Sequence, residues 1–156
     1  MTWANNMIRD HYPGWVGIDD IIVASIHEHL VRGGVALDVG CGRRSPLGAS
    51  RDRLSLLVGT DLKIGDLEEN VDIEAVVAAD GAGLPFPPCL FDLVVSKTVI
   101  EHMLDPLSFF REAYRVLRPG GVFIWATSNL RSLPILVSAL TPLGVHKWVY
   151  RQGFGS

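Results

Sequence analysis

The sequence predicts an α/β protein with a doubly wound, mainly parallel β-sheet, and two observations indicate this fold class. Short apolar runs of strand length alternate along the chain with segments of helical periodicity. The run at 91–95 is apolar at every position except Asp92 rather than at every second residue, which is typical of strands buried on both faces of a parallel sheet. Strands separated by helical connections pair in parallel through right-handed crossovers, so one sheet covered on both faces is expected.

Five apolar runs are the predicted strands, and each is followed by glycine or a polar residue. They cover residues 35–39, 54–58, 75–79, 91–95 and 122–126. The connection between the first two strands, residues 43–53, contains Pro46 and Gly48 and is short for a crossover helix. Parallel strands need about a dozen connecting residues, so this connection is barely long enough.

Two helices are predicted by apolar spacing and by end signals. Residues 18–31 repeat apolar side chains at helical intervals, begin near two aspartates and stop before a pair of glycines. The second helix has Asp105 as its N-cap and Pro106 at its first position, and the Pro-Gly-Gly run at 119–121 is predicted to end it. The side chains that line one face of this helix are Leu107, Phe110, Tyr114 and Leu117.

Length, charge and cysteine usage restrict the function classes. With 156 residues, of which 48% are hydrophobic, the chain suits one domain with a packed core. The formal net charge of −3 argues against a nucleic-acid partner bound mainly through its phosphates. Cys41 and Cys89 are far apart, so neither a disulfide framework nor a metal site is predicted. No apolar run reaches the roughly 20 residues that span a bilayer, and no signal peptide is visible, so we expect a cytoplasmic protein without a membrane span.

Two charged segments follow the first strand. The basic residues that fall close together are Arg43, Arg44, Arg51, Arg53 and Lys63. The acidic residues that come after them are Asp66, Glu68, Glu69, Asp72 and Glu74. The simplest interpretation is a solvated loop followed by a solvated face, and a local basic patch is the alternative.

Candidate ligand groups come at the ends of three successive strands. Asp38, Gly40 and Gly42 mark the end of the first predicted strand, Asp61 follows the second and Asp80 follows the third. Ligands of doubly wound sheets bind beyond the carboxyl ends of the strands. Glycines let the backbone approach a ligand, and a carboxylate after the second strand can accept hydrogen bonds from both ribose hydroxyls. The third carboxylate can accept from an amino group such as that of adenine.

These segments resemble the motifs of class I S-adenosylmethionine-dependent methyltransferases. The cofactor motifs that carry the resemblance are Ala-Leu-Asp-Val-Gly-Cys-Gly at 36–42, Val-Gly-Thr-Asp at 58–61, Ala-Asp at 79–80 and Leu-Pro-Phe at 84–86. The segments similar to the small-molecule, type 11-like branch are 91–96, 99–102, 105–106 and 115–121. The resemblance covers roughly residues 18–130 and implies a Rossmann-like methyltransferase fold. It further implies S-adenosylmethionine as cofactor and a small-molecule methyl acceptor.

The resemblance also implies roles for individual residues. Those assigned to the cofactor are Asp38, Gly40, Cys41, Gly42, Asp61, Leu62, Asp80, Gly81, Ala82 and Ser96. Asp38 would reach the ammonium of the methionine part, Asp61 would hold the ribose and Asp80 would meet the adenine amino group. Gly81 and Ala82 would lie against the adenine ring, and Ser96 would offer backbone contacts near the amino-acid end. His102 is the candidate base for a hydroxyl acceptor, and a structural role for it is the alternative.

Three features depart from the family pattern. Arg44 stands where the family has a third glycine, so it would close the pocket or meet the cofactor's carboxylate. Lys97 places a cation near the expected sulfonium, which is unfavourable unless it points away or serves an acidic acceptor. Only 30 residues follow Ala126, and we expect a helix near 133–140 and a tail but not the family's two closing strands.

A C-terminally shortened fold would leave the strand at 122–126 as an exposed edge, which a homodimer or the tail could cover. The expected organisation is one domain, with an N-terminal lid segment at 1–17, a core at 18–130 and a C-terminal helix and tail at 131–156. Trp3, Tyr12 and Trp15 would form the lid or serve as surface anchors.

Two other functions remain open at this point. A non-catalytic module that keeps the methyltransferase fold would explain missing closing strands, whereas the carboxylates after the second and third strands argue against it. An NAD-dependent oxidoreductase shares the sheet and the ribose carboxylate. Its fingerprint, however, requires three glycines that open a long helix, and Arg44 and Pro46 interrupt that pattern.

Overall fold

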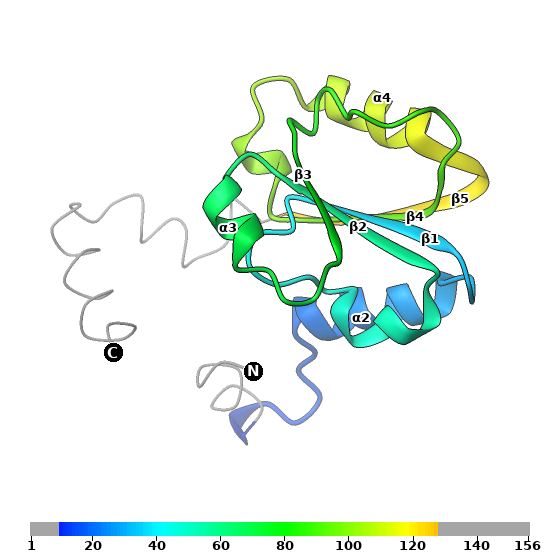
Figure 1. Ribbon diagram of the computed structural model, residues 1–156. Coiled ribbons are helices and arrows are strands. Elements are labelled where there is room, and N and C mark those ends of the chain that lie inside the picture. Colours follow the sequence, from blue (N-terminus) through cyan, green and yellow to red (C-terminus); the bar gives the residue numbers. More distant parts are fainter. Residues whose placement is uncertain (1–9, 128–156) are drawn as a thin grey trace, which may run out of the picture.

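The computed structural model describes residues 10–127, which form a five-stranded parallel sheet with helices on both faces (Figure 1). The strands are β1 (Val35–Val39), β2 (Leu56–Asp61), β3 (Ala75–Ala78), β4 (Phe91–Lys97) and β5 (Leu117–Ala126). Their order is β3-β2-β1-β4-β5, and the predicted doubly wound α/β fold is therefore confirmed. The predicted helix near 133–140, the tail at 131–156 and Trp3 lie outside the described residues.

The strand order reverses between β1 and β4. From β1 the chain adds β2 and β3 on one side, and it then returns to place β4 and β5 on the other. β1 pairs in parallel with both neighbours, so that Val39 is in register with Thr60 and with Ser96. Such a reversal opens a crevice beyond the carboxyl ends of the two central strands, which is where ligands of this fold class bind.

Two apolar layers flank the sheet. On one face, Ile22 and Ile26 of α2 (Ile18–His29) are buried together with Leu47, which precedes the short 3₁₀-helix η1 (Gly48–Arg53). On the other face, Phe109 and Val116 of α4 (Pro106–Val116) pack on the sheet. Figure 1 shows α2 and α4 on opposite sides of the strands. Within residues 10–127, no helix combines the length and apolar character needed to cross a lipid bilayer.

The helix after β4 begins as predicted but buries a different face. Asp105 Oδ1 accepts hydrogen bonds from the N–H groups of Leu107 (3.1 Å) and Ser108 (3.3 Å), so the predicted cap is present. The residues that α4 buries are Phe109, Ala113 and Val116. Leu107 and Tyr114, on the predicted apolar face, are 65% and 81% exposed. Phe110 of the same face is half-buried, and its ring packs edge-on against Trp125 of β5.

The prediction that Pro-Gly-Gly at 119–121 ends the helix is wrong. α4 ends at Val116, and Leu117 already pairs with Phe91 as the first residue of β5. The next paired residues are Leu93 and Val122, so residues 118–121 form a bulge in the strand. Arg118 fastens this bulge, because its Nη1 donates to Asp92 Oδ2 at 2.8 Å.

The two charged segments pair with each other rather than standing as separate solvated surfaces. The ion pairs are Arg43 with Asp66 and Glu69, Arg44 with Asp72, and Arg51 with Glu74. They join the connection between β1 and β2 to the connection between β2 and β3, which includes the short helix α3 (Ile64–Glu68). Exposed pairs of this kind each stabilise by at most about 1 kcal/mol. Their main effect is to neutralise the arginines that would form a basic patch, the alternative interpretation of this segment.

Candidate functional site

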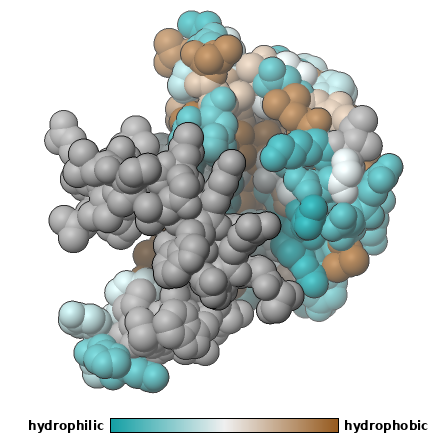
Figure 2. All heavy atoms as spheres, turned by 90° about the vertical axis from the view of Figure 1, so that its left-hand side faces the viewer, coloured by the Kyte–Doolittle hydropathy of each residue, from teal (hydrophilic) through white to brown (hydrophobic). Residues whose placement is uncertain are grey.

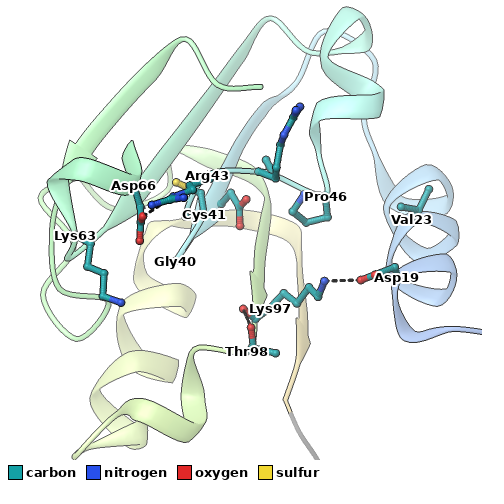
Figure 3. Close-up of a pocket in the computed structure, with 14 residues that line it drawn as sticks. Asp19, Val23, Gly40, Cys41, Arg43, Pro46, Lys63, Asp66, Lys97 and Thr98 are labelled. Atoms are coloured by element: carbon teal, nitrogen blue, oxygen red, sulfur yellow. Dashed lines mark hydrogen bonds and ion pairs between the residues drawn. The ribbon is translucent and has the colours of Figure 1, made fainter. Parts of the chain in front are cut away.

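Two adjoining cavities lie at the carboxyl ends of the strands, with volumes of about 820 and 690 Å³. The larger one is bounded by the turn after β1, the loop at 43–46 and the first turns of α2 (Figure 3). The smaller one is bounded by the ends of β2 and β3 and by the loop at 98–105. The residues that line both are Gly40, Lys63, Asp66, Lys97 and Thr98. Figure 2 views this end of the sheet, and hydrophilic side chains predominate on the part that the grey atoms leave visible.

The turn after β1 requires glycine for two different reasons. The Gly40 N–H donates to the Thr60 carbonyl at 2.7 Å, which turns the chain across the end of β2. Gly40 has a φ of 75°, and a Cβ built on it would lie 2.1 Å from Val99 Cγ2, so the turn leaves no room for a side chain. Gly42 also has a positive φ, 50°, but a Cβ there would meet nothing within 4 Å. Backbone at Gly42 is therefore open to a ligand in the larger cavity.

The turn also orients Asp61 at the end of β2. Asp61 Oδ2 accepts from the Gly42 N–H at 3.0 Å, and Oδ1 accepts from the Lys63 N–H at 2.9 Å. The carboxylate lines the smaller cavity next to Leu62, whose side chain is exposed. Each carboxylate oxygen has a second lone pair, so Asp61 retains the capacity to accept hydrogen bonds from a ligand.

Asp38 is the buried charge of the site. Its side chain is 1% exposed, lines the larger cavity, and has an Oδ2 atom without a hydrogen-bond partner among the described residues. Burial raises the pKa of Asp38 to about 7, a hydrogen bond from Ser45 opposes the rise and the negative charge of Asp61 adds to it. A buried carboxylate oxygen without a hydrogen-bond partner is costly, so this position is suited to a cationic ligand group.

Asp80, Gly81 and Ala82 follow β3 and form one wall of the smaller cavity. Asp80 Oδ1 accepts from the Ala82 N–H at 2.9 Å, which turns the chain toward α4. A Cβ on Gly81 would lie 2.9 Å from a ring carbon of Phe109, so glycine lets this turn sit directly on the helix. The Asp80 side chain itself is exposed at the rim.

The structure places Ser96 differently from its neighbours. Ser96 is 2% exposed, and it is not among the residues that line either cavity. The following residues, Lys97 and Thr98, line both, and Thr98 has a φ of 55°. Positive φ is strained for a threonine and is typical of functional turns. Cys41 also lines the larger cavity although the residue is largely buried, and burial raises the pKa of its thiol to about 12.

Lys97 contacts a residue that the sequence interpretation did not assign to the site. Its Nζ lies 2.5 Å from Asp19 Oδ1, and Figure 3 shows the lysine reaching across the cavity to α2. Because α2 precedes β1 and runs antiparallel to it, the first turn of α2 lies at the carboxyl end of the sheet. That topology, together with the unexplained Lys97, was the available signal for Asp19.

His102 and Glu101 differ in their surroundings. His102, in the short 3₁₀-helix η2 (Ile100–His102), is exposed and lines the smaller cavity. Glu101 Oε2 accepts from the Thr127 hydroxyl at 2.7 Å, which ties η2 to the end of β5. Of the predicted aromatic lid, neither Tyr12 nor Trp15 is among the residues that line the two cavities.

The local structure after β1 is unlike that of a dinucleotide-binding site. Such a site needs a helix that starts at the glycine turn and directs its N–H groups at a pyrophosphate. Here the turn is followed by an irregular loop and then by the six residues of η1. Asp72 holds this loop in place, because its Oδ2 accepts from the Ser45 N–H at 3.0 Å and its carboxylate pairs with Arg44.

Comparison with known proteins identifies the family. Residues 37–125 match the family model described as a methyltransferase domain. The chain is 35% identical over 107 residues to a probable S-adenosylmethionine-dependent methyltransferase of Mycolicibacterium smegmatis, an alignment that covers 65% of this chain and 40% of that protein. It is 29% identical over 132 residues to the ubiquinone biosynthesis O-methyltransferase of Parvibaculum lavamentivorans, covering 72% and 50%.

A solved structure agrees with these matches. The S-adenosylmethionine-dependent methyltransferase of Mesorhizobium loti superposes with a TM-score of 0.61 at 25% identity, over 72% of this chain and 54% of that one. The chain thus spans about half the length of the relatives it matches. Because the family model covers more than half of the sequence and the fold agrees with it, this chain belongs to the class I S-adenosylmethionine-dependent methyltransferase family.

Proposed function

We propose that this chain binds S-adenosylmethionine across the two adjoining cavities and directs its methyl group to a small-molecule acceptor. The observation that carries the proposal is the buried Asp38 carboxylate, which lines the larger cavity and has one buried oxygen without a hydrogen-bond partner among the described residues. The cofactor has a cationic ammonium that suits this buried carboxylate, and neither NAD nor a simple sugar has one at the corresponding end. The larger cavity then takes the methionine part and the smaller one takes the adenosine.

The remaining polar groups suit the adenosine part. Asp61, held by two backbone N–H groups, accepts from the ribose hydroxyls, and Asp80 accepts from the adenine amino group. Gly81 and Ala82 provide the wall against the ring, and Leu62 covers its other edge. The glycine turn from Gly40 to Gly42, which includes Cys41, lines the larger cavity and brings backbone close to the amino-acid end.

The bound cofactor supplies an activated methyl group on a sulfonium. The chain therefore has to position the cofactor, align the acceptor and exclude water. Lys97 and Thr98 stand where the two cavities meet, which is the position expected for the reacting centre. His102 lies in the wall of the smaller cavity with an exposed imidazole, so it is the candidate base that takes the proton from a hydroxyl acceptor.

A hydroxyl-bearing small molecule is the acceptor class that we propose. The M. smegmatis relative is described only as a methyltransferase, whereas the P. lavamentivorans relative is an O-methyltransferase. The pairing of the arginines with acidic residues removes the basic surface that a nucleic-acid acceptor would use.

The test is a calorimetric titration of the chain with S-adenosylhomocysteine, with NAD as the control ligand. We expect saturable binding of S-adenosylhomocysteine alone. Asp38→Asn should weaken it, and Asp52→Asn is the matched control because Asp52 is exposed on η1 and is not among the cavity-lining residues. Absence of binding by a folded sample would contradict the proposal. Binding without methyl transfer to any of a panel of phenols, enols and acyl carboxylates would favour a non-catalytic module.

A further inference from the structure

The amino-acid end of the proposed cofactor is a zwitterion, so its site needs a cation as well as Asp38. The positively charged residues that line the larger cavity are Arg43, Arg44, Lys63 and Lys97. The carboxylate and the ammonium of the cofactor are bonded to the same carbon atom. When Asp38 binds the ammonium, the cation that binds the carboxylate must therefore lie near Asp38.

The two arginines are committed elsewhere. Arg43 Nε lies 2.8 Å from Asp66 Oδ1 and 3.2 Å from Glu69 Oε2, so two carboxylates already hold it. The Arg44 side chain is 76% exposed and pairs with Asp72, which is not among the residues lining the cavity. The sequence suggests Arg44 as a partner of the cofactor's carboxylate, whereas in the structure its ion pair with Asp72 directs its charge away from Asp38.

Lys97 meets the requirement better than Lys63. Lys63 follows Asp61 on the ribose side, whereas Lys97 ends the strand that pairs directly with β1. Burial is the largest influence on the pKa of Asp38, and among the cations of the cavity Lys97 is the one whose charge lowers it. The electrostatic field of Lys97 therefore reaches the Asp38 carboxylate.

The present partner of Lys97 is easily exchanged. Asp19 belongs to the first turn of α2, and its side chain is 59% exposed, compared with 36% for Lys97. Ion pairs with such exposure contribute little to stability. Lys97 can therefore leave Asp19 for a ligand carboxylate in a less exposed position at little cost.

We propose that Lys97 binds the carboxylate of the cofactor's amino-acid part and that Asp19 is the partner from which it is exchanged. This proposal rests on the proposed function and assigns one positioning residue within it. It also explains how a cation is tolerated close to a sulfonium, because the ligand's own carboxylate neutralises it.

The experiment compares three ligands by calorimetry. S-adenosylhomocysteine has the complete amino-acid end, its decarboxylated analogue keeps the ammonium but lacks the carboxylate, and methylthioadenosine lacks both. Lys97→Met should weaken S-adenosylhomocysteine about tenfold or more, as expected for a lost hydrogen bond between charged groups. The same variant should change the affinities for the other two ligands by no more than about twofold. Lys97→Arg should retain the preference for S-adenosylhomocysteine over the decarboxylated analogue.

The controls separate this proposal from the assignment of the cofactor. Arg44→Met should still bind S-adenosylhomocysteine more tightly than the decarboxylated analogue. Loss of this preference in Arg44→Met would assign the carboxylate to Arg44 and overturn the proposal. Asp19→Asn should bind S-adenosylhomocysteine with equal or higher affinity than the unmodified chain. Weaker binding would contradict the proposal that the ligand carboxylate replaces Asp19 as the partner of Lys97. A uniform loss for all three ligands in Lys97→Met would also overturn the proposal. Failure of the unmodified chain to bind any of them would instead contradict the proposed function.

Discussion

The backbone N–H of Gly42 donates to Asp61 Oδ2 at 3.0 Å, so the glycine turn after β1 fixes the carboxylate that follows β2. The Lys63 N–H holds the other oxygen at 2.9 Å. Two motifs that are 19 residues apart in the sequence thus form one unit. The unit aims the lone pairs that remain on Asp61 into the smaller cavity.

Replacing Asp61 should therefore affect binding more than folding. Asp61→Ala should weaken S-adenosylhomocysteine by at least about tenfold, because hydrogen bonds to a charged group are lost. It should cost about 1–2 kcal/mol of unfolding free energy, since two backbone donors lose their acceptor. Titration calorimetry and urea unfolding measure the two effects. Unchanged affinity in a folded variant would refute the role of Asp61 at the ribose.

Asp38 should make the stability of the ligand-free chain depend on pH. Burial raises its pKa from 3.8, the ordinary value of an aspartate, to about 7 in the folded chain, so the folded state binds more protons than the unfolded state between these pH values. Stability should therefore fall as pH rises from about 4 to 7 and level off above, with a total effect of at most about 4 kcal/mol.

Asp38→Asn tests this directly. The variant should be more stable than the unmodified chain at pH 8 and should lose the decline between pH 4 and 7, as measured by thermal unfolding across pH. The same variant should bind S-adenosylhomocysteine more weakly, because the carboxylate that meets the ammonium is gone. Parallel pH profiles for the two proteins would show that the buried carboxylate is not the cause.

The strand ends could be predicted from the sequence because apolar runs of strand length stop at glycine or aspartate. Parallel strands bring such ends to one edge, so Asp38, Asp61 and Asp80 could be placed together without coordinates. The buried face of α4 could not be placed in the same way. Apolar side chains occur on both sides of that helix, and only packing shows that Phe109 is buried while Tyr114 is exposed.

The bulge in β5 and the ion pairs were missed for a related reason. Pro-Gly-Gly at 119–121 is a general stop signal, and the sequence does not show that Leu117 has already joined the sheet opposite Phe91. Pairs such as Arg43 with Asp66 depend on how two loops meet in space. The pattern of charges along the sequence does not show which acidic residue an arginine pairs with or how close the two side chains lie.

Gly40 and Gly42 should respond differently to alanine. Gly40→Ala combines a positive φ with a Cβ 2.1 Å from Val99 Cγ2, so we expect a loss of about 3 kcal/mol in unfolding free energy. Gly42→Ala has open space and carries only the backbone strain, about 1 kcal/mol. The double variant Gly40→Ala with Val99→Ala should recover part of the loss. Equal effects of the two single variants would contradict the steric explanation.

His102 is the residue for which a catalytic and a structural role can be separated most cleanly. Its imidazole is exposed in the cavity wall, and its backbone N–H donates to the Val99 carbonyl at 2.9 Å in η2. His102→Gln keeps that backbone bond.

The His102→Gln variant should therefore unfold like the unmodified chain and bind S-adenosylhomocysteine with the same affinity. If the imidazole takes the acceptor's proton, the rate of methyl transfer to a hydroxyl acceptor should fall about 100-fold or more. The measurement is the rate of methyl transfer at saturating cofactor, compared between the variant and the unmodified protein. A variant with an unchanged transfer rate would remove His102 from the chemistry and leave it as a rim residue.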